Sequence, residues 1–305
     1  MRFDIAPSVE GRLLRDHLRT LGVSGKLSAR LKRLENGILL NGTPVTVRAV
    51  LHGGDVLDLA IEEREPPLHV LPRDLPLETV LECEGFLVAN KPANMPTHPS
   101  HGHFEDTLAN ALAFHYGSEV QPFRPRFINR LDRNTTGVVL VARHALSAAT
   151  LSVAMAHGEM KKTYLALVKG CVDRELTVKT GIRRREESII FREVCALEEG
   201  AEAETLVKPL VSSAAFSLVE LHPKTGRTPQ LRVHMAHIGH PLLGDELYGD
   251  GAGMARHALH AAELRFPWDG EEITARAPLP LDMKEKIREL GEEAIGIVEG
   301  KKAQA

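Results

Sequence analysis

The sequence predicts an α+β fold, in which a small N-terminal α/β module precedes a larger domain with a mainly antiparallel central sheet flanked by helices. Apolar segments typical of strands follow one another between residues 160 and 221 without a helical pattern between them, which favours antiparallel pairing. A charged stretch with four prolines, residues 62–76, is typical of a semi-rigid linker. These observations divide the chain into a module at 1–61, a linker at 62–76, a main domain at 77–295 and a flexible tail at 296–305.

The N-terminal module is predicted from two helical patterns that are followed by strands. Leucines spaced over residues 13–21 indicate an amphipathic helix, and Ser28 is placed to cap a second one. The apolar run 38–40 leads into Asn41-Gly42, a dipeptide that favours a tight hairpin turn. Residues 56–59 then alternate like a second strand.

The main domain shows both helical and strand patterns along its length. The expected elements are strands within 80–88, helices at Thr107–His115 and Ala145–Met155, a strand at Met160–Val168, a hairpin of Ser188–Cys195 with Glu204–Leu210, a strand at Phe216–Leu221 and a helix at Leu281–Leu290.

Composition narrows the classes of protein to which this chain can belong. Its three cysteines are far apart and odd in number, which argues for a reducing cytoplasm and against a disulfide or zinc framework. No apolar run is long enough to predict a membrane span. The net charge of −3 speaks against a nucleic-acid partner, although local basic patches matter more than the sum.

The most informative segment is residues 126–143, where one carboxylate, Asp132, lies among four arginines. These are Arg126, Arg130, Arg133 and Arg143. Turn-forming residues follow Asp132, and an apolar, β-branched run after them predicts a buried strand. Nearby positive charge keeps a carboxylate ionised, and an ionised acid in a cationic setting suits nucleophilic work on a polyanion. Taken alone, the local sequence favours an aspartate that caps a turn before Asn134.

Arg130-Leu131-Asp132 followed by Thr135-Thr136-Gly137 resembles the signature of the RluA-type pseudouridine synthases. Further segments resemble that family's motifs in the expected order. They are Lys91-Pro92-Ala93 with His98-Pro99, Lys162-Thr163-Tyr164, Gly226 to His234, His240 to Asp245, and Leu247-Tyr248-Gly249. Each short motif is weak alone, but the ordered set, from about Leu77 to Pro280, is specific.

Three positions depart from the family pattern. Asn129 replaces a histidine, Asn94 replaces a common glycine, and Pro229 replaces another histidine. At the third, we expect Thr228 to cap a helix with Pro229 in its first turn, and Gly239 to end that helix.

The resemblance implies an RNA pseudouridine synthase with three catalytic residues. Asp132 would act at the ribose, Arg232 would pair with that carboxylate, and the ring of Tyr164 would stack on the uracil. Helical spacing puts Arg232 at the edge of an apolar stripe. The alternative for Arg232 is an ordinary surface arginine, and the alternative for Tyr164 is a tyrosine that fills the core. The reaction is a rearrangement, without oxidation or hydrolysis, so no cofactor is expected.

The same resemblance assigns substrate-binding roles to Arg130, Arg227 and Leu231. Arg130 would fill the gap left when the target uridine is flipped out of its stack, although a phosphate contact is the alternative. No metal is expected. His98, His101 and His103 are close in sequence but lack a cysteine or carboxylate in a known zinc spacing.

The N-terminal module resembles the alpha-L RNA-binding motif of ribosomal proteins. Its helices would present Arg12, Arg15, Arg19, Arg30, Lys32 and Arg33 to RNA, although a merely solvated face is the alternative. The family makes ribosomal RNA the first expected partner and transfer RNA the second, for a cytoplasmic protein that is most simply a monomer.

Two rival functions follow from the same residues. A non-catalytic RNA-binding or ribosome-assembly factor could keep this fold, and the departures at Asn129 and Pro229 leave room for it. A glycosidic hydrolase would usually need two cooperating acids, whereas these motifs supply Asp132 alone.

Overall fold

The computed structural model describes residues 1–61, 70–117, 123–186, 188 and 191–300. Parts of the predicted linker (62–69), of the predicted tail (301–305) and of the predicted strand 188–195 (189–190) therefore lie outside the described residues. The chain forms two compact units. The first comprises Met1–Val88, Pro99–Asn129 and Leu140–His157, and the second Ala89–His98, Arg130–Val139 and Gly158–Ala305.

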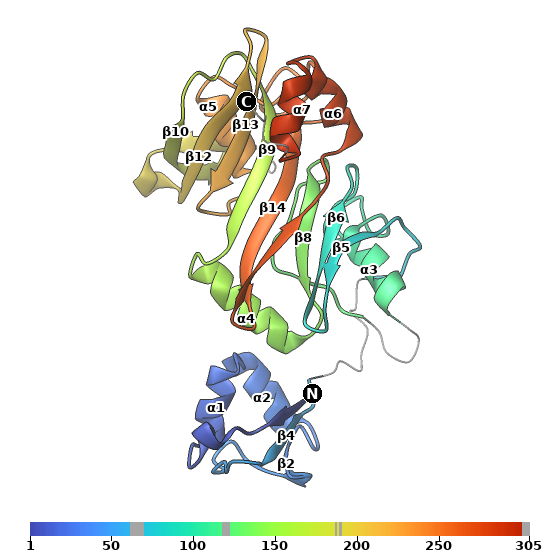
Figure 1. Cartoon of the computed structure of the whole chain (residues 1–305), viewed down its shortest axis with the longest axis vertical. Helices are drawn as coiled ribbons and strands as arrows, with labels where there is room; N and C mark the ends of the chain where they lie inside the picture. Colours follow the sequence, from blue (N-terminus) through green and yellow to red (C-terminus); the bar gives the residue numbers. More distant parts are fainter. Residues whose placement is uncertain (62–69, 118–122, 187, 189–190, 301–305) are drawn as a thin grey trace. The chain divides into compact units, whose positions relative to one another are not determined.

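The first unit begins with a four-stranded sheet of order β1-β4-β2-β3 and two helices (Figure 1). Its elements are β1 (Arg2–Asp4), α1 (Leu14–Thr20), α2 (Gly25–Arg33), β2 (Ile38–Leu40), β3 (Thr43–Pro44) and β4 (Val56–Leu59), with a 3-10 turn at Pro7–Val9. Leu14, Leu18, Leu31 and Leu57 pack in its core. The prediction that Ser28 caps the second helix is wrong, because Ser24 accepts the N–H of Leu27 one turn earlier.

The remainder of the first unit contains β5, β7, α3, α4 and parts of β6 and β8. Their bounds are β5 (Glu78–Glu82), β6 (Phe86–Lys91), α3 (Leu108–Tyr116), β7 (Arg126–Phe127), β8 (Thr136–Ala142) and α4 (Ala145–Ala156). Thr107 and Asn110 cap α3 reciprocally, and this explains why the predicted helix begins there. The boundary between the two units falls inside β6 and β8.

In the second unit the strand order is β11-β10-β12-β13-β9-β14-β8, with β15 beside β14. The strands are β9 (Lys161–Lys169), β10 (Leu176–Arg184), β11 (Arg192–Cys195), β12 (Ala201–Ser212), β13 (Phe216–Pro223), β14 (Leu259–Trp268) and β15 (Glu271–Arg276). Pairings among β9 to β15 are antiparallel, and β8 runs parallel to β14. The α+β prediction with a mainly antiparallel sheet is thus confirmed.

One predicted pairing is wrong. Residues 188–195 and 204–210 were expected to form a hairpin, but β10 lies between β11 and β12 and pairs with both. The sequence of β10 mixes charged residues with Thr and Gly, so its apolar alternation is weak and the strand was missed.

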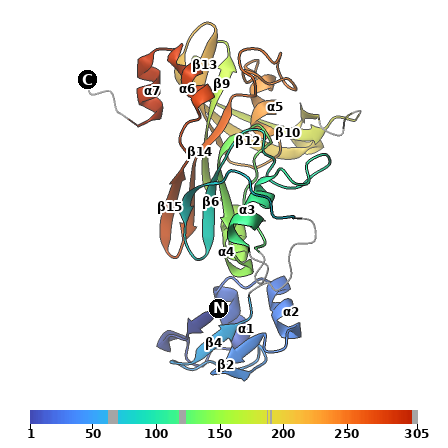
Figure 2. The same ribbon diagram turned by 90° about the vertical axis from the view of Figure 1, so that its right-hand side faces the viewer.

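Helices cover both faces of the sheet in the second unit. They are α5 (Gln230–His237), α6 (Leu281–Arg288) and α7 (Glu292–Val298). Leu165 and Leu167 of β9 pack with Met283 and Ile287 of α6. Tyr164 points to the opposite face, because successive strand residues alternate sides. That face carries α5, whose His234 contacts β12 (Figures 1 and 2).

The first residues of the predicted tail, 296–298, belong to α7. No helix in the described ranges is both long and apolar enough to cross a membrane.

Candidate active site

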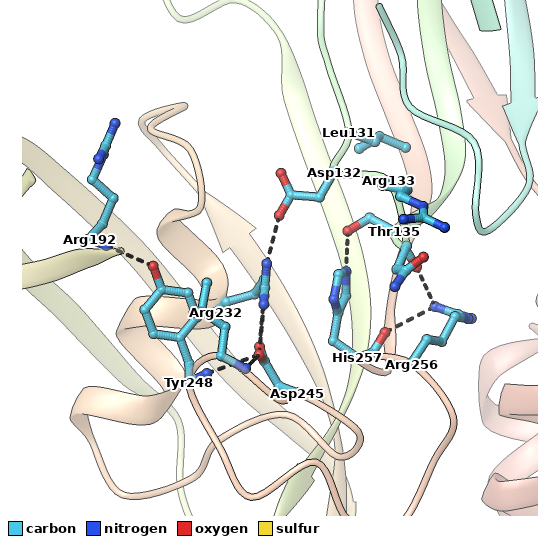
Figure 3. Close-up of polar contacts among 12 residues, drawn as sticks. Leu131, Asp132, Arg133, Thr135, Arg192, Arg232, Asp245, Tyr248, Arg256 and His257 are labelled. Atoms are coloured by element: carbon cyan, nitrogen blue, oxygen red, sulfur yellow. Dashed lines mark hydrogen bonds and ion pairs between the residues drawn. The ribbon is translucent and has the colours of Figure 1, made fainter. Parts of the chain in front are cut away.

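The centre of the candidate site is an ion pair between Asp132 and Arg232. Nη1 of Arg232 donates to Oδ2 of Asp132 at 3.3 Å, so the structure brings these two residues together (Figure 3). The side chain of Asp132 is 26% exposed, whereas that of Arg232 is 13% exposed. The carboxylate therefore keeps an accessible side while a buried cation holds the other.

Asp132 lies in a tight turn that is held from two sides. The N–H of Thr135 donates to the Asp132 carbonyl at 3.1 Å and closes the turn. The Thr135 hydroxyl contacts Nε2 of His257 at 2.8 Å. On the other side, the Thr97 hydroxyl donates to the carbonyl of Leu131 at 2.8 Å and accepts its N–H at 3.2 Å. These contacts fix the backbone on both sides of the carboxylate.

Lys91 also holds this turn, from the end of β6. Its buried ammonium donates to the carbonyls of Pro92, Met95 and Arg133 at 2.7, 2.8 and 3.0 Å. Burial lowers the pKa of Lys91 to about 7, while the charge of Asp132 acts in the opposite direction. The resemblance singled out Lys91 by its motif but gave it no role.

Gly137 explains the glycine that ends the Asp132 motif. Its φ is +111°, and a Cβ at this position would lie 2.2 Å from the carbonyl oxygen of Ala261. Only glycine allows β8 to approach β14 so closely at this backbone angle. Because Ala261 is also paired with Tyr164 of β9, this approach brings the Asp132 turn toward Tyr164.

The helix α5 is docked on the sheet by two buried polar residues. The amide of Gln230 donates to the carbonyl of Glu204 and to the hydroxyl of Thr205 at 3.0 and 2.9 Å. One turn later, Nδ1 of His234 contacts the same Thr205 hydroxyl at 3.0 Å. Burial lowers the pKa of His234 to about 4, so this histidine is neutral near pH 7. Arg232 lies between them in sequence and therefore projects away from β12.

Asp245 is the partner of Arg232 that sequence reasoning missed. Nε and Nη2 of Arg232 each donate to one Asp245 oxygen at 2.7 Å, and Asp245 is fully buried. Oδ1 of Asp245 also accepts the N–H groups of Leu247 and Tyr248. Burial opposes ionisation of Asp245, but the Arg232 contacts outweigh it and keep its pKa below the usual value. The segment was recognised as a motif, but a lone aspartate after an apolar run did not indicate which cation it holds.

Tyr164 is buried on the same face of the sheet as α5. Burial, and secondarily the charge of Asp132, raise the pKa of Tyr164 above its usual value. The phenol therefore stays protonated and neutral near Asp132. This favours the predicted stacking role for its ring over a role as a base.

The three predicted substrate-binding residues lie in different settings. Arg130 is exposed, and its charge contributes to lowering the pKa of His98 after the larger effect of burial. Arg227 is exposed in the loop before α5, and its Nε donates to the carbonyl of Glu202 at 3.3 Å. Leu231 is only 7% exposed, so it can offer a substrate no more than an edge. Among these residues, no contact with Asp132 is found in the described structure.

His257 lies between the Asp132 turn and the Arg232–Asp245 pair (Figure 3). Burial, and then the charge of Arg232, lower the pKa of His257. Its imidazole is therefore neutral and can exchange a hydrogen bond with Thr135 without adding charge to the site. Nothing in the sequence pattern distinguished this histidine from the other fourteen.

The departures from the family pattern have local explanations at two positions. Asn94 has φ +60°, and asparagine tolerates this left-handed conformation better than other non-glycine residues. Oδ1 of Asn129 accepts the N–H of Leu140 at 2.7 Å, which ties the strand that follows the motif.

At the third position the cap prediction is wrong. Pro229 precedes the first turn of α5, and no side chain at that position caps the helix. Instead, Oε1 of Gln230 accepts the Arg227 N–H and the Thr225 hydroxyl. Gly239, with φ +85°, follows the helix end as predicted.

Comparison with known proteins identifies the family. Residues 85–237 match the family described as RNA pseudouridylate synthase, over half of the chain. The chain belongs to this family. It is therefore an RNA pseudouridine synthase, an isomerase that acts on RNA. Asp132 and Arg232 both belong to the sequence motifs that resemble this family.

Two relatives show how much of the chain this family covers. The protein named uncharacterized RNA pseudouridine synthase YjbO, from Bacillus subtilis, is 36% identical over 279 residues, which are 90% of this chain and 98% of that protein. Ribosomal large subunit pseudouridine synthase D of Vibrio cholerae is 34% identical over 286 residues, 87% of each chain.

Solved structures share the fold of this chain. Human RNA pseudouridylate synthase domain containing 1 superposes with a TM-score of 0.57 at 28% identity, covering 67% of this chain and 83% of its own. Human RNA pseudouridylate synthase domain containing 4 has the same TM-score at 22% identity, covering 70% of this chain and 92% of its own, and shares the fold.

Proposed function

We propose that this synthase modifies uridines of ribosomal RNA, with transfer RNA as the second candidate, and that Asp132 is its catalytic carboxylate. Relatives named as ribosomal large subunit pseudouridine synthases support the choice of RNA. The observation that carries the catalytic assignment is the pair of Asp132 with the buried Arg232, beside a protonated Tyr164.

Each of the three residues has a separate part in the reaction. The bond between uracil N1 and ribose C1′ breaks, the base turns, and C5 bonds to C1′. N1 takes up a proton while C5 loses one, so the product is an isomer of the substrate. Asp132 acts at the ribose in the first step, Arg232 orients that carboxylate, and the ring of Tyr164 holds the detached uracil.

Arg130, Arg227 and Leu231 complete the proposed substrate site. Arg130 is exposed two residues before Asp132, where it can occupy the stack vacated by the flipped-out uridine. Arg227 leaves most of its guanidinium donors to RNA, since one contact to Glu202 engages only Nε. Leu231 precedes Arg232 on α5 and would offer the substrate its exposed edge.

The N-terminal module is proposed to bind RNA, as the alpha-L resemblance implies. Lys32 and Arg33 are exposed on α2, whereas Arg12 is exposed but lies before α1 and not on a helix as predicted; all three remain candidates for phosphate contacts. Arg30 donates to the Ile61 carbonyl, so part of its side chain has a structural use. We further propose that the enzyme acts as a monomer in the cytoplasm, since Asp132, Tyr164 and Arg232 all come from one chain.

The test is a map of pseudouridines in total RNA from cells with and without this gene, made by a chemical method that marks each modified base. Cells lacking the gene are complemented with the wild-type protein or with Asp132→Asn, which keeps the size of the side chain. We expect sites in ribosomal RNA to disappear without the gene and to return only with the wild type. Sites restored by Asp132→Asn would contradict the catalytic assignment, and sites lost from transfer RNA alone would contradict the choice of substrate.

A further inference from the structure

Tyr248 lies at a junction that the proposed chemistry does not use. Its ring covers one face of Arg232, with the guanidinium carbon 5.1 Å from the ring centroid. Its hydroxyl accepts the backbone N–H of Arg192, the first residue of β11, at 2.9 Å (Figure 3). One side chain thus contacts both the arginine that holds Asp132 and the end of the β10–β11 hairpin.

Arg232 is held in two perpendicular ways by one short segment of chain. Asp245 binds the edge of the guanidinium through two hydrogen bonds in its plane. Tyr248 covers the face, where the electron-rich ring attracts the cation. Asp245 also accepts the N–H of Tyr248 at 3.1 Å, so the two contacts are built as a unit.

From Tyr248 the contacts continue outward along the hairpin. The rings of Phe191 and Tyr248 are 4.8 Å apart between centroids, and Arg185 lies over Phe191 with its guanidinium carbon 5.4 Å from that ring. Arg185 is exposed, and its N–H donates to the Phe191 carbonyl at 3.1 Å. Two adjacent rings, Phe191 and Tyr248, therefore lie between the exposed Arg185 and the mostly buried Arg232.

The charge of the hairpin indicates what its outer end meets. Arg184 and Arg185 are exposed, and no carboxylate pairs with either in the described part of the chain. Arg183 differs, because Glu193 and Glu199 both pair with it. In an enzyme that acts on RNA, two exposed arginines at the end of a hairpin suit the phosphate backbone.

We propose that Tyr248 is a positioning residue that ties the β10–β11 hairpin to Arg232, so that RNA held by the hairpin and the catalytic pair are ordered together. This inference rests on the proposed role of Arg232. The hydroxyl of Tyr248 anchors the hairpin, and its ring seats the guanidinium. The two functions belong to different atoms and can be separated by substitution.

The test compares Tyr248→Phe and Tyr248→Leu, with Tyr116→Phe as the control that removes a tyrosine hydroxyl elsewhere in the chain. The substrate is 5-tritiated total RNA from cells lacking this gene, and the assay is tritium release, because bonding at C5 expels its hydrogen. We expect Tyr248→Phe to raise KM about three- to tenfold with little change in kcat, since one backbone hydrogen bond of the hairpin is lost. Tyr248→Leu should in addition lower kcat about tenfold, through the lost cation–π contact.

A second measurement does not depend on activity. Hydrogen–deuterium exchange of the peptide that contains Arg192 should be faster in Tyr248→Phe than in the wild type, and unchanged in Tyr116→Phe. The proposal would be overturned if Tyr248→Phe and the wild type exchanged at the same rate. It would also be overturned if kcat and KM of both Tyr248 variants lay within about twofold of the wild type. If Asp132→Asn remains active in the same assay, the proposed catalytic role fails instead, and the exchange result still decides the hairpin anchor.

Discussion

Replacing Asp245 by asparagine should weaken the catalytic pair while leaving Asp132 and Arg232 in place. The amide keeps the size of the side chain and can still accept the N–H groups of Leu247 and Tyr248 through its oxygen. Its NH2 group, however, would then face the guanidinium, donor against donor. The 2.7 Å bond from Nε is lost and the bond from Nη2 then meets a neutral acceptor, so Asp132, at 3.3 Å, remains as the ionic partner of Arg232.

The expected loss in the free energy of unfolding follows from the burial of the Arg232–Asp245 pair. Removing one partner of a buried ion pair costs about 3–5 kcal/mol, because the other charge stays buried without compensation. Arg232 is 13% exposed and keeps Asp132, so we expect the lower end, about 3 kcal/mol in the free energy of unfolding. If seating Arg232 beside Asp132 costs the same amount in the variant, kcat falls about a hundredfold.

Urea denaturation followed by circular dichroism measures the free energy of unfolding, and tritium release from 5-tritiated RNA measures kcat. The matched control is Glu263→Gln, which removes a carboxylate paired with Arg265 and Arg276. Those arginines are 42% and 69% exposed, so this loss should stay within about 1 kcal/mol and leave kcat unchanged. An Asp245→Asn protein as stable and as active as the control would refute the argument that Asp245 seats Arg232.

The pH dependence of stability provides a signed check on the same residue. The folded pKa of Asp245 lies below its unfolded value, so its contribution is fully present above the unfolded pKa and is lost as pH falls through the folded one. Acidification should therefore reduce the stability difference between wild type and Asp245→Asn. A difference that stays constant below the ordinary range of aspartate would contradict the assignment.

Three further predictions concern the support of the Asp132 turn. Gly137→Ala places a Cβ 2.2 Å from a carbonyl oxygen of β14 and should lower the free energy of unfolding, measured by denaturant titration, by at least about 2 kcal/mol. The control Gly158→Ala is also at positive φ but in open space, and should lower it by only about 1 kcal/mol. Thr135→Val leaves the buried imidazole of His257 without its partner and should cost about 1–3 kcal/mol, which Thr135→Ser should largely restore; equal stabilities of Val and Ser would count against this contact. Lys91 has a pKa of about 7 in the folded protein and an ordinary pKa of 10.5, so the unfolded state binds more protons between these two values. Over that range the stability of the wild type should rise with pH by up to about 1.4 kcal/mol per pH unit, relative to Lys91→Met. Parallel pH profiles of stability for the two proteins would show that the pKa of Lys91 is not lowered.

Much of the fold follows from local signals in the sequence. The helix α3 begins where Thr107 can cap it, and Asn41-Gly42 turns the chain with positive φ at both residues. Strand β10 was missed because its partners, β11 and β12, supply the pairing that its own alternation does not indicate. A pairing of strands is a property of the sheet, and periodicity within one segment cannot specify it.

The same distinction between local sequence signals and contacts in the folded chain applies to the candidate site. Asp132, Tyr164 and Arg232 could be predicted because each occupies a motif whose order along the chain is specific. Asp245 and Tyr248 were also in a recognised motif, but their roles depend on which side chain they meet in space. A guanidinium that must present Nη1 to Asp132 needs its other edge and its face occupied, and only the folded chain brings Asp245 and Tyr248 to those places. The orientation of Arg232 is therefore set by a segment that is remote from Asp132 in sequence, and changes in that segment should reach the reaction through Arg232.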